Sequence, residues 1–402
     1  MVKVVKLESI ATSVDYGLGL SADWKPTPYR YLRTTDMTSG RIYWDRVPFC
    51  TPGKNDVQKG TLEDLDIVIS RTGANAGAPG IVLGPPKNTL FAGYLVRFKI
   101  DKKLANPKYV YLILTSQLWS DYSKYSRTGS GQPQLNAKLM GRFEFPLPSL
   151  QIQNSIVDML WPIHEQISNC HEALKLNREF LGDLYSYLFE QKTMSQQSTF
   201  VDNADLGFKI PATWRVEPLG KSKILNIVKT GVKEFGGEKK YFATADIDGN
   251  DFQTTATNID YLGRESRANM QPITSSVWIA KMKDTEKTFF LNDEHGKLID
   301  RSIFSTGFFG FQTSKEFLPY LYGFLNSNYF VTKKNFFATG ATQEAINQWM
   351  LDYIYIPIPD SELISKFNEV AIPIMNQIAV SQMSIFSYTD AIDTLLPQIL
   401  NN

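Results

Sequence analysis

The sequence TGSGQPQLNAKLMGRFEFPLP at residues 128–148 returns in altered form as TGATQEAINQWMLDYIYIPIP at residues 339–359. With a constant offset of 211, residues 128–191 align with residues 339–402 without a gap. Across residues 128–167 ten of forty positions are identical, whereas ordinary composition gives roughly two or three matches. This offset is too long for a solenoid repeat, so the sequence indicates a duplicated half-protein.

The duplication extends upstream of this stretch. Tyr109 and Tyr111 align with Tyr320 and Tyr322 at the same offset, and YLRTTDM at 31–37 aligns with YFATADI at 241–247 at an offset of 210. Strand-like runs recur in both halves, with helix-like stretches between them. These runs predict strands at 66–70, 94–100, 143–148, 276–280, 308–312 and 353–359, and helices at 107–122 and 316–328. We therefore expect a mixed α/β (α+β) fold with internal pseudo-twofold symmetry.

Two connectors carry apolar residues in alternating steps of three and four, which is the pattern of a coiled-coil seam. The seam positions are Ile163, Ile167, Leu174, Leu181 and Leu184 in the first connector, and Ile374, Ile378, Ile385, Ile392 and Leu395 in the second. Two matched seams in one chain favour packing on each other as antiparallel helices; the alternative is that each packs on its own domain. Because Pro162 and Pro373 each remove a backbone donor, we expect a kink or break there, followed by about 28 straight residues, or roughly 42 Å.

These patterns divide the chain into five segments. We predict a first recognition-type domain at 1–150, a spacer helix at 151–191, a linker at 192–209, a second domain at 210–361 and a second spacer helix at 362–402. The sequences of the two domains have diverged more than those of the connectors. This difference indicates that the connectors share one task, whereas each domain recognises a different partner.

The charge distribution separates these segments further. Residues 1–150 carry 20 Lys and Arg against 12 Asp and Glu, whereas both connectors are acidic. A basic segment fits a phosphate-rich partner such as DNA, and acidic connectors fit protein partners. Two cysteines and the lack of a long apolar run or charged leader predict a cytoplasmic protein without a membrane span.

Motifs for catalysis are missing from the sequence. There is no phosphate-binding loop, no dinucleotide fingerprint and no amino-methyltransferase motif. His164 and His171, seven residues apart on an acidic helix, favour a solvated helix face over a metal pair, and His295 is expected in a loop. We therefore expect neither catalysis nor a cofactor or metal in this chain.

Several motifs in order resemble the DNA specificity subunit of type I restriction–modification systems. They are YGLGL at 16–20, YRYLRTTDM at 29–37, LDIVISRTGANAGAPG at 65–80, FAGYLVRF at 91–98 and TGSGQPQLNAKLMGRFEFPLPSLQIQNSIV at 128–157. The last motif is the most specific, and the resemblance covers nearly the whole chain. The second half departs from the pattern, because SVWIAKMKDTEK at 276–287 stands where the first half has DIVISRTGANAG.

The resemblance implies two target-recognition domains that read a bipartite, asymmetric double-stranded DNA target. It also implies a non-catalytic chain that docks two methyltransferase subunits using S-adenosylmethionine and two restriction–translocase subunits using ATP. The alternatives are a DNA-directed nuclease or single-chain methyltransferase, which the missing motifs disfavour, and a coiled-coil scaffold without DNA contact, which the basic first segment disfavours.

Candidate DNA contacts follow from polar and basic side chains on Gly-rich loops and strand ends. The candidates are Arg33, Thr34, Arg71, Thr72, Asn75, Arg127, Ser130, Gln132 and Gln134 in the first half, and Thr244, Lys281, Lys283, Lys333, Lys334, Thr339 and Gln343 in the second. The alternative for SRTGANAG at 70–77 is a turn that does not contact DNA. The repeated Thr-Gly loops are equally consistent with DNA contact and with a shared packing role.

Overall fold

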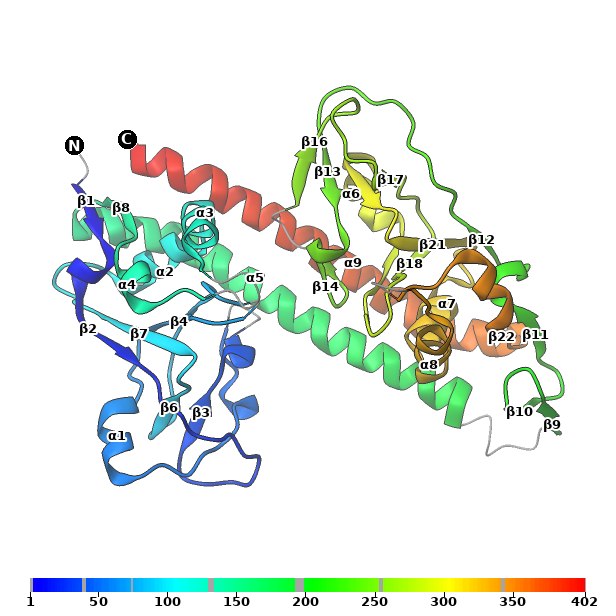
Figure 1. The fold of residues 1–402 in the computed structure, drawn as a ribbon, viewed down its shortest axis with the longest axis horizontal. Helices are drawn as coiled ribbons and strands as arrows, with labels where there is room; N and C mark the ends of the chain where they lie inside the picture. Colours follow the sequence, from blue (N-terminus) through cyan, green and yellow to red (C-terminus); the bar gives the residue numbers. More distant parts are fainter. Residues whose placement is uncertain are drawn as a thin grey trace. The chain divides into compact units, whose positions relative to one another are not determined.

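The computed structural model describes residues 3–37, 41–73, 75–128, 134–191, 199–252, 256–340 and 344–401. The chain forms two compact units (Figure 1): unit 1 comprises Met1–Glu172 with Ser387–Asn402, and unit 2 comprises Ala173–Phe386. Helices and strands alternate in both, which confirms the expected mixed fold.

The elements follow the predicted runs closely. Before the first long helix the chain forms β1 (Lys3–Lys6), β2 (Ala11–Tyr16), β3 (Arg30–Leu32), α1 (Lys54–Gly60), β4 (Ile67–Ser70), β5 (Pro79–Ile81), β6 (Thr89–Phe91), β7 (Leu95–Ile100), α2 (Pro107–Thr115), α3 (Gln117–Ser126), α4 (Ala137–Gly141) and β8 (Glu144–Leu147). The first long helix is α5 (Leu150–Tyr185), which continues into a π-helical turn at Ser186–Gln191.

The second half begins with β9 (Phe200–Asn203), β10 (Phe208–Pro211), β11 (Arg215–Pro218), β12 (Leu225–Ile227), β13 (Lys239–Phe242), β14 (Ile247–Asp248), β15 (Asp251–Phe252), β16 (Thr257–Ile259) and β17 (Ala268–Met270). It continues with β18 (Ser276–Ala280), β19 (Thr288–Leu291), α6 (Gly296–Arg301), β20 (Ser302–Ser305), β21 (Phe308–Thr313), α7 (Leu318–Asn326), α8 (Asn328–Phe337), β22 (Tyr355–Ile358) and α9 (Ser361–Asn401).

Sheet topology repeats between the units, as the duplicated sequence predicts. Unit 1 has a four-stranded sheet in the order β2-β7-β4-β5, and unit 2 has the corresponding order β12-β21-β18-β19. The pair β1–β8 is matched by β11–β22, and the parallel pair β3–β6 is matched by β13–β20. Tyr109 and its counterpart Tyr320 each donate from the phenol to the carbonyl of the equivalent proline, Pro146 or Pro357. The halves therefore share one architecture although their surfaces have diverged.

The two connectors are single long helices, so of the kink or break expected at the prolines, the break does not occur. Pro162 lies inside α5 and Pro373 lies inside α9. A proline removes one backbone donor, but packing along the apolar face keeps the helix continuous on both sides. At 1.5 Å per residue, the 36 residues of α5 span about 54 Å and the 41 residues of α9 span about 61 Å.

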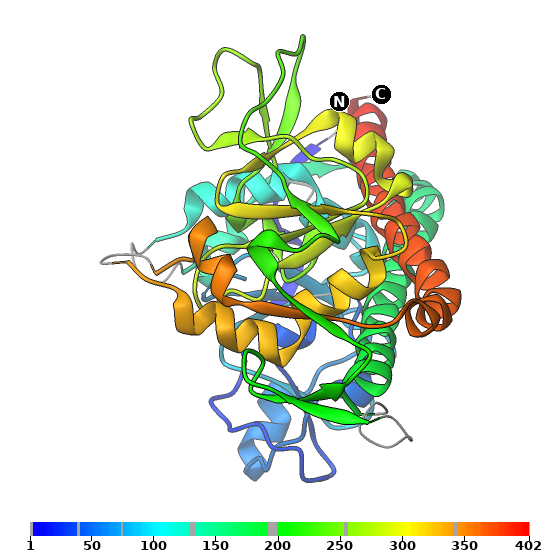
Figure 2. The ribbon, with the colours of Figure 1, turned by 90° about the vertical axis from the view of Figure 1, so that its right-hand side faces the viewer.

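Within each unit a segment of α5 lies beside a segment of α9 in antiparallel orientation (Figures 1 and 2). In unit 1 the core contains Leu160, near the start of α5, and Leu396, near the end of α9. In unit 2 the Tyr185 ring, at the end of α5, lies 6.4 Å from the Phe367 ring, near the start of α9. The seams also pack on the domains, since Trp161 contacts Tyr111 of α2. Both packing modes expected from the sequence therefore occur together.

Most predicted seam positions are packed. Residues in the hydrophobic cores or against them are Ile163, Leu174, Leu181, Leu184, Ile374, Ile378, Ile385 and Leu395. Ile392 is buried as well, whereas Ile167 is only half-buried. The heptad pattern therefore located the packed face, but it did not show that this face is wide enough to include Trp161 and Phe386.

Two local expectations are corrected. The second part of the predicted linker folds as a hairpin, because β9 pairs with β10 and buries Leu206 and Ile210 in the core of unit 2. His164 is buried rather than solvated, with its ring 5.1 Å from the Tyr111 ring and 5.0 Å from the Trp161 ring.

One helix among the described residues, Ser361–Gln398, is long and apolar enough to cross a membrane by length and composition. Of its most apolar window, 44% is buried inside the structure. This is weak evidence for a membrane span, because the core helix of a soluble protein meets the same test. We attribute the apolar residues of α9 to its packed face, which includes Ile364, Phe367, Ala371 and Ile378.

Candidate nucleic-acid interface

In unit 1 two loops that are distant in sequence come together at the end of β4. The Arg71 amide donates to the Tyr94 carbonyl at 2.8 Å, and the Arg71 carbonyl accepts from the Leu135 amide at 2.8 Å. Thr72 forms a β-bridge with Gln134, which in turn pairs with Thr128. The SRTGANAG turn and the loop after α3, predicted separately from the sequence, therefore form one surface.

Unit 2 repeats this backbone arrangement with a different sequence. The Lys281 amide donates to the Gly307 carbonyl at 3.0 Å, and the Lys281 carbonyl accepts from the Ile346 amide at 3.0 Å. Met282 forms a bridge with Ala345, which also pairs with Thr339. The prediction that residues 276–287 stand where the first half has its Gly-rich turn is confirmed. A basic residue thus follows the central strand in each unit: Arg71 after β4 and Lys281 after β18.

The two basic side chains lie in different surroundings. The Arg71 guanidinium lies 5.0 Å from the centroid of the Tyr16 ring, and no carboxylate pairs with it among the described residues. The Lys281 ammonium donates to the Thr306 carbonyl at 2.7 Å and lies 4.2 Å from the Phe309 ring, while burial lowers its pKa. Arg71 therefore retains donors for an anionic or base-edge partner, whereas the donors of Lys281 are partly engaged.

Arg127 lies under the unit 1 loops. Its Nη2 atom lies next to Gly77, where an added Cβ would be 3.7 Å away, and its Nε is buried without a hydrogen-bond partner among the described residues. Burial lowers the pKa of the Arg127 guanidinium. Asn75 and Gln134, on the same loops, are exposed. Sequence reasoning thus found the loops, and the structure divides their residues into exposed members, such as Asn75 and Gln134, and half-buried members, such as Arg127.

The candidate lysines of unit 2 also divide by surroundings. Lys283 pairs with Glu344 at 2.6 Å, which raises the pKa of Lys283. Lys333 is half-buried, with its ammonium 5.8 Å from the Tyr329 ring.

Lys334 differs from the expectation of an exposed DNA contact. It is buried at 3% exposure, and its ammonium donates to the carbonyls of Met282 and Thr285 while burial lowers its pKa. Its donors close the loop after β18, so we leave Lys334 out of the proposed contact set.

The strand ends at residues 33–36 and 243–246 share a capping arrangement. Asp36 accepts from the Arg33 amide at 2.8 Å, and Asp246 accepts from the Ala243 amide at 2.9 Å. Arg33 also pairs with Asp36 through its guanidinium at 2.9 Å, so part of its charge is neutralised. The adjoining Thr34 is half-buried.

Thr244 lies nearer to the loop surface of its unit. Its methyl group packs against Gly307, whose carbonyl accepts from the Lys281 amide, and its carbonyl accepts from Lys287 at 2.8 Å. Thr339 is exposed and its backbone pairs with Ala345. Ser130, Gln132 and Gln343 lie outside the described residues.

Sequence reasoning missed two aromatic residues of the unit 1 surface. Tyr16 is 47% exposed beside Arg71, and Tyr94, whose carbonyl accepts from the Arg71 amide, is 54% exposed. Exposed tyrosines next to an arginine suit contact with sugars and bases. Tyr16 ends β2 and Tyr94 directly precedes β7, both far from position 71 in the sequence, so no local sequence pattern connects them.

No cluster of three or more His, Cys, Asp or Glu side chains that could hold a metal ion occurs within the described parts of the chain. His295 is fully buried, with Nε2 3.0 Å from the Gln382 side-chain oxygen and Nδ1 2.9 Å from that of Asn292. Burial lowers the pKa of His295 to about 4, so this imidazole is neutral near pH 7. It is a packed core residue rather than the expected loop residue.

Comparisons with known proteins agree with the architecture. Residues 2–178 match the family model described as the type I restriction modification DNA specificity domain. The type I restriction enzyme MjaIX specificity subunit of Methanocaldococcus jannaschii is 22% identical over 403 residues, covering 91% of this chain and 89% of that protein. The structure also resembles the type I restriction–modification S subunit from M. genitalium, with a TM-score of 0.50 and 13% identity, covering 99% of this chain and 95% of that one.

Proposed function

We propose that this chain is a specificity subunit of a type I restriction–modification system and that each of its two units reads one element of a bipartite DNA target. Specificity subunits are non-catalytic targeting subunits, so the chemistry of these systems lies on partner chains. The observation that carries the proposal is the repeated loop surface, with Arg71 in unit 1 and Lys281 in unit 2 at the same backbone position.

The proposed DNA-contacting set consists of the candidates on or beside the repeated loop surface of each unit. In unit 1 it comprises Arg71, Thr72, Asn75 and Gln134, with Tyr16 and Tyr94 beside them. The weaker set in unit 2 comprises Thr244, Lys281, Lys283, Lys333 and Thr339. Arg33, Thr34 and Arg127 would support the loops of unit 1, and Ser130, Gln132 and Gln343 stay candidates from sequence alone. Because the two surfaces differ in side chains, we propose that the two DNA elements differ and that the target is asymmetric.

The long helices supply the other proposed role. Their acidic surfaces, with a seam packed inside each unit, suit contact with protein rather than DNA. We propose that they dock two methyltransferase subunits, which bind S-adenosylmethionine, and two restriction–translocase subunits, which use ATP. The complex would act in the cytoplasm, and α9 would serve as a core helix rather than a membrane span.

The proposal predicts that the chain is inactive alone and directs activity only in a complex. The test is to assay methyl transfer to host DNA by the purified chain, by the methyltransferase partner and by both together. Site-specific methylation should require both proteins. Methyl transfer or cleavage by the isolated chain at a rate comparable to the complex would contradict a targeting role.

A further inference from the structure

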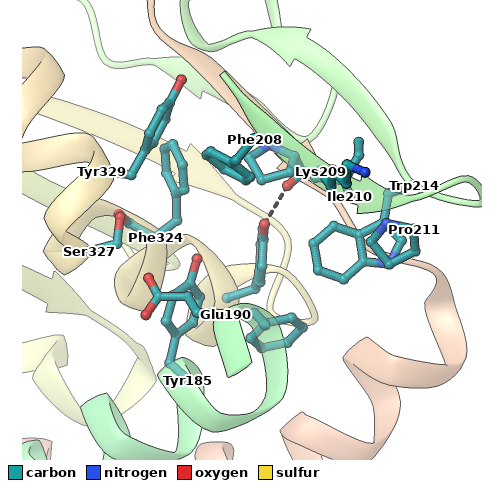
Figure 3. Close-up of a pocket in the computed structure, with 13 residues that line it drawn as sticks. Tyr185, Glu190, Phe208, Lys209, Ile210, Pro211, Trp214, Phe324, Ser327 and Tyr329 are labelled. Carbon is teal, nitrogen blue, oxygen red and sulfur yellow. Dashed lines mark hydrogen bonds between the residues drawn. The ribbon is translucent and has the colours of Figure 1, made fainter. Parts of the chain in front are cut away.

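Unit 2 contains an apolar cavity of about 250 Å³ where the end of α5 meets α7 and the hairpin β9–β10 (Figure 3). Its walls are mainly aromatic, and they include Tyr185, Phe208, Trp214, Phe324 and Tyr329. The hairpin forms one side, since Phe208, Lys209, Ile210 and Pro211 all line the cavity. The Phe208 ring packs edge-on against the Tyr329 ring with centroids 5.4 Å apart.

Unit 1 contains the repeat-related groove, with a volume of about 210 Å³. Ile113, Ser116, Leu118, Pro146 and Leu396 line it, and they correspond at the offset of 211 to Phe324, Ser327, Tyr329, Pro357 and Tyr185 of the unit 2 cavity. The end of α9 thus takes the place of the end of α5, as the internal symmetry requires. The two hollows are one feature of the duplicated fold.

The two hollows differ in what covers them. In unit 2, the hairpin β9–β10 buries Ile210 to 3% exposure and covers Tyr329 with Phe208. The lining of the unit 1 groove comes from α2, Ser116, α3, Pro146 and α9, and no hairpin of the described residues contributes to it. Leu118, the counterpart of Tyr329, is consequently 47% exposed. Unit 1 therefore presents to solvent the apolar surface that unit 2 covers with its own chain.

We infer that the unit 1 groove is a docking site for an extended segment of a protein partner that carries an aromatic or large aliphatic side chain. The chemistry of this occupant follows from the unit 2 counterpart, where the sequence Phe208–Lys209–Ile210–Pro211 forms one wall of the equivalent hollow. The lining is mainly apolar, with Ile113, Leu118, Pro146, Leu396 and Pro397 beside the polar Ser116, Gln117 and Asp393. Such a lining favours burial of apolar side chains, and it offers a carboxylate but no cation, so it does not suit a nucleic-acid phosphate. This surface is separate from the loops around Arg71 and does not depend on DNA recognition.

The hairpin itself supplies the probe. A fluorescently labelled peptide with the sequence of residues 199–212 is titrated with the full chain, and binding is followed by fluorescence anisotropy. Saturable binding is expected, and Leu118→Asp should weaken it at least tenfold because a carboxylate would stand in the apolar groove. A peptide with Phe208→Ser should also lose most of its affinity.

The matched control is Leu104→Asp. Leu104 is a unit 1 leucine with 49% exposure that does not line the groove, so this variant should bind the peptide like the unchanged chain. Both leucines are exposed, so both variants should fold, which thermal unfolding checks. Absence of peptide binding, or equal binding by the Leu118→Asp chain, would overturn the inference.

Two other outcomes would assign the groove differently. Peptide binding that survives Leu118→Asp but is lost in Tyr329→Asp would place the probe in unit 2 and contradict the inference. A dimer of the unchanged chain that dissociates in Leu118→Asp, measured by sedimentation velocity, would give the groove to a second copy and contradict a partner-protein occupant.

Discussion

Arg71 and Lys281 occupy the same backbone position in the two units but differ in the freedom of their side chains. The Lys281 ammonium is held by the Thr306 carbonyl, whereas the Arg71 guanidinium only stacks on Tyr16. A free guanidinium has the planar donor pair that matches the edge of guanine or a phosphate. At the scale of residues, the Arg71 side chain of unit 1 is therefore better suited than Lys281 to direct readout of DNA bases.

We predict that Arg71→Ala weakens discrimination at one half of the DNA target by about 1–3 kcal/mol if the side chain reads a base. Arg71→Lys separates the two possible roles, because lysine retains the charge but loses the planar fork. Loss of discrimination in both variants indicates base readout. A uniform loss of affinity with a smaller salt dependence in Arg71→Ala alone indicates a phosphate contact. Unchanged affinity and unchanged sequence preference in Arg71→Ala would remove this residue from the interface.

His295 provides a prediction about pH and stability. Its folded pKa of about 4 lies below the ordinary value of 6.5, because burial disfavours the charged imidazole. The unfolded chain therefore binds more protons between these values, and the stabilisation present above pH 6.5 is lost as the pH falls towards 4. This contribution is on the order of 3 kcal/mol. Urea unfolding across this pH range should show a shallower pH dependence for His295→Gln than for the unchanged chain, and equal slopes would contradict the assignment.

At the scale of elements, the long helices show which sequence signals were sufficient to predict the structure. The heptad pattern located the packed face through residues such as Leu174 and Ile378, because apolar periodicity records burial directly. Of the kink or break predicted at Pro162 and Pro373, the break does not occur, since the loss of one backbone donor is smaller than the packing energy along the rest of the helix. The strand run 276–280 was predicted with correct ends, and both faces of this strand are buried.

Other features could not be predicted because they depend on contacts between distant residues. The hairpin β9–β10 looked like a polar linker, and its burial depends on aromatic partners such as Tyr329 and Trp214. Lys334 looked like a surface charge, but two carbonyls from the loop after β18 accept from its ammonium. In both cases the contacting residues lie far away in the sequence. For the same reason the loops of the candidate interface were found, while their pairing and the tyrosines beside Arg71 were not.

The helix packing leads to a stability prediction. Leu174 is 1% exposed in the core of unit 2, so Leu174→Asp buries an unpaired carboxylate and should cost about 3–5 kcal/mol of unfolding free energy. Ile385, the equivalent seam position in α9, is less buried, so Ile385→Asp should cost less. Both variants should also impair docking of the methyltransferase partner.

Leu176→Asp is the matched control for this prediction, because Leu176 lies two residues further along α5 and is 49% exposed. Its unfolding free energy should stay close to that of the unchanged chain. Denaturant unfolding of the three variants, with co-purification of the partner, provides the comparison. Equal stability of Leu174→Asp and Leu176→Asp would refute the packed seam.

At the scale of the whole molecule, the duplicated architecture is the basis for the proposed target in two parts. Each unit repeats the four-stranded sheet and the loop pair at its end, and α5 and α9 each contribute residues to both units. The segment of about 28 residues expected after each proline agrees with the helix that follows it, since residues 163–191 and 374–401 are helical. If the helices set the separation of the two units, the spacing between the two DNA elements should depend on helix length.

Deleting one heptad from both α5 and α9 removes seven residues, or about 10 Å of helix, from each. Because base pairs stack at about 3.4 Å, the preferred spacer between the two DNA elements should shorten by about three base pairs, or activity should be lost. The deletion must be made in both helices, since a single deletion disturbs their packing register. Methylation mapping of the deleted complex provides the spacer, and an unchanged spacer would contradict a rigid helical separation.

The most direct test of the central claim is to map every methylated site that the complete complex produces on host DNA. Two units with different loop surfaces predict two short, different sequence elements separated by base pairs of unrestricted sequence. Arg71→Ala should relax the sequence requirement in one element and leave the other unchanged. A continuous target, a palindromic target, or relaxation of both elements by this single substitution would contradict separate recognition by the two units.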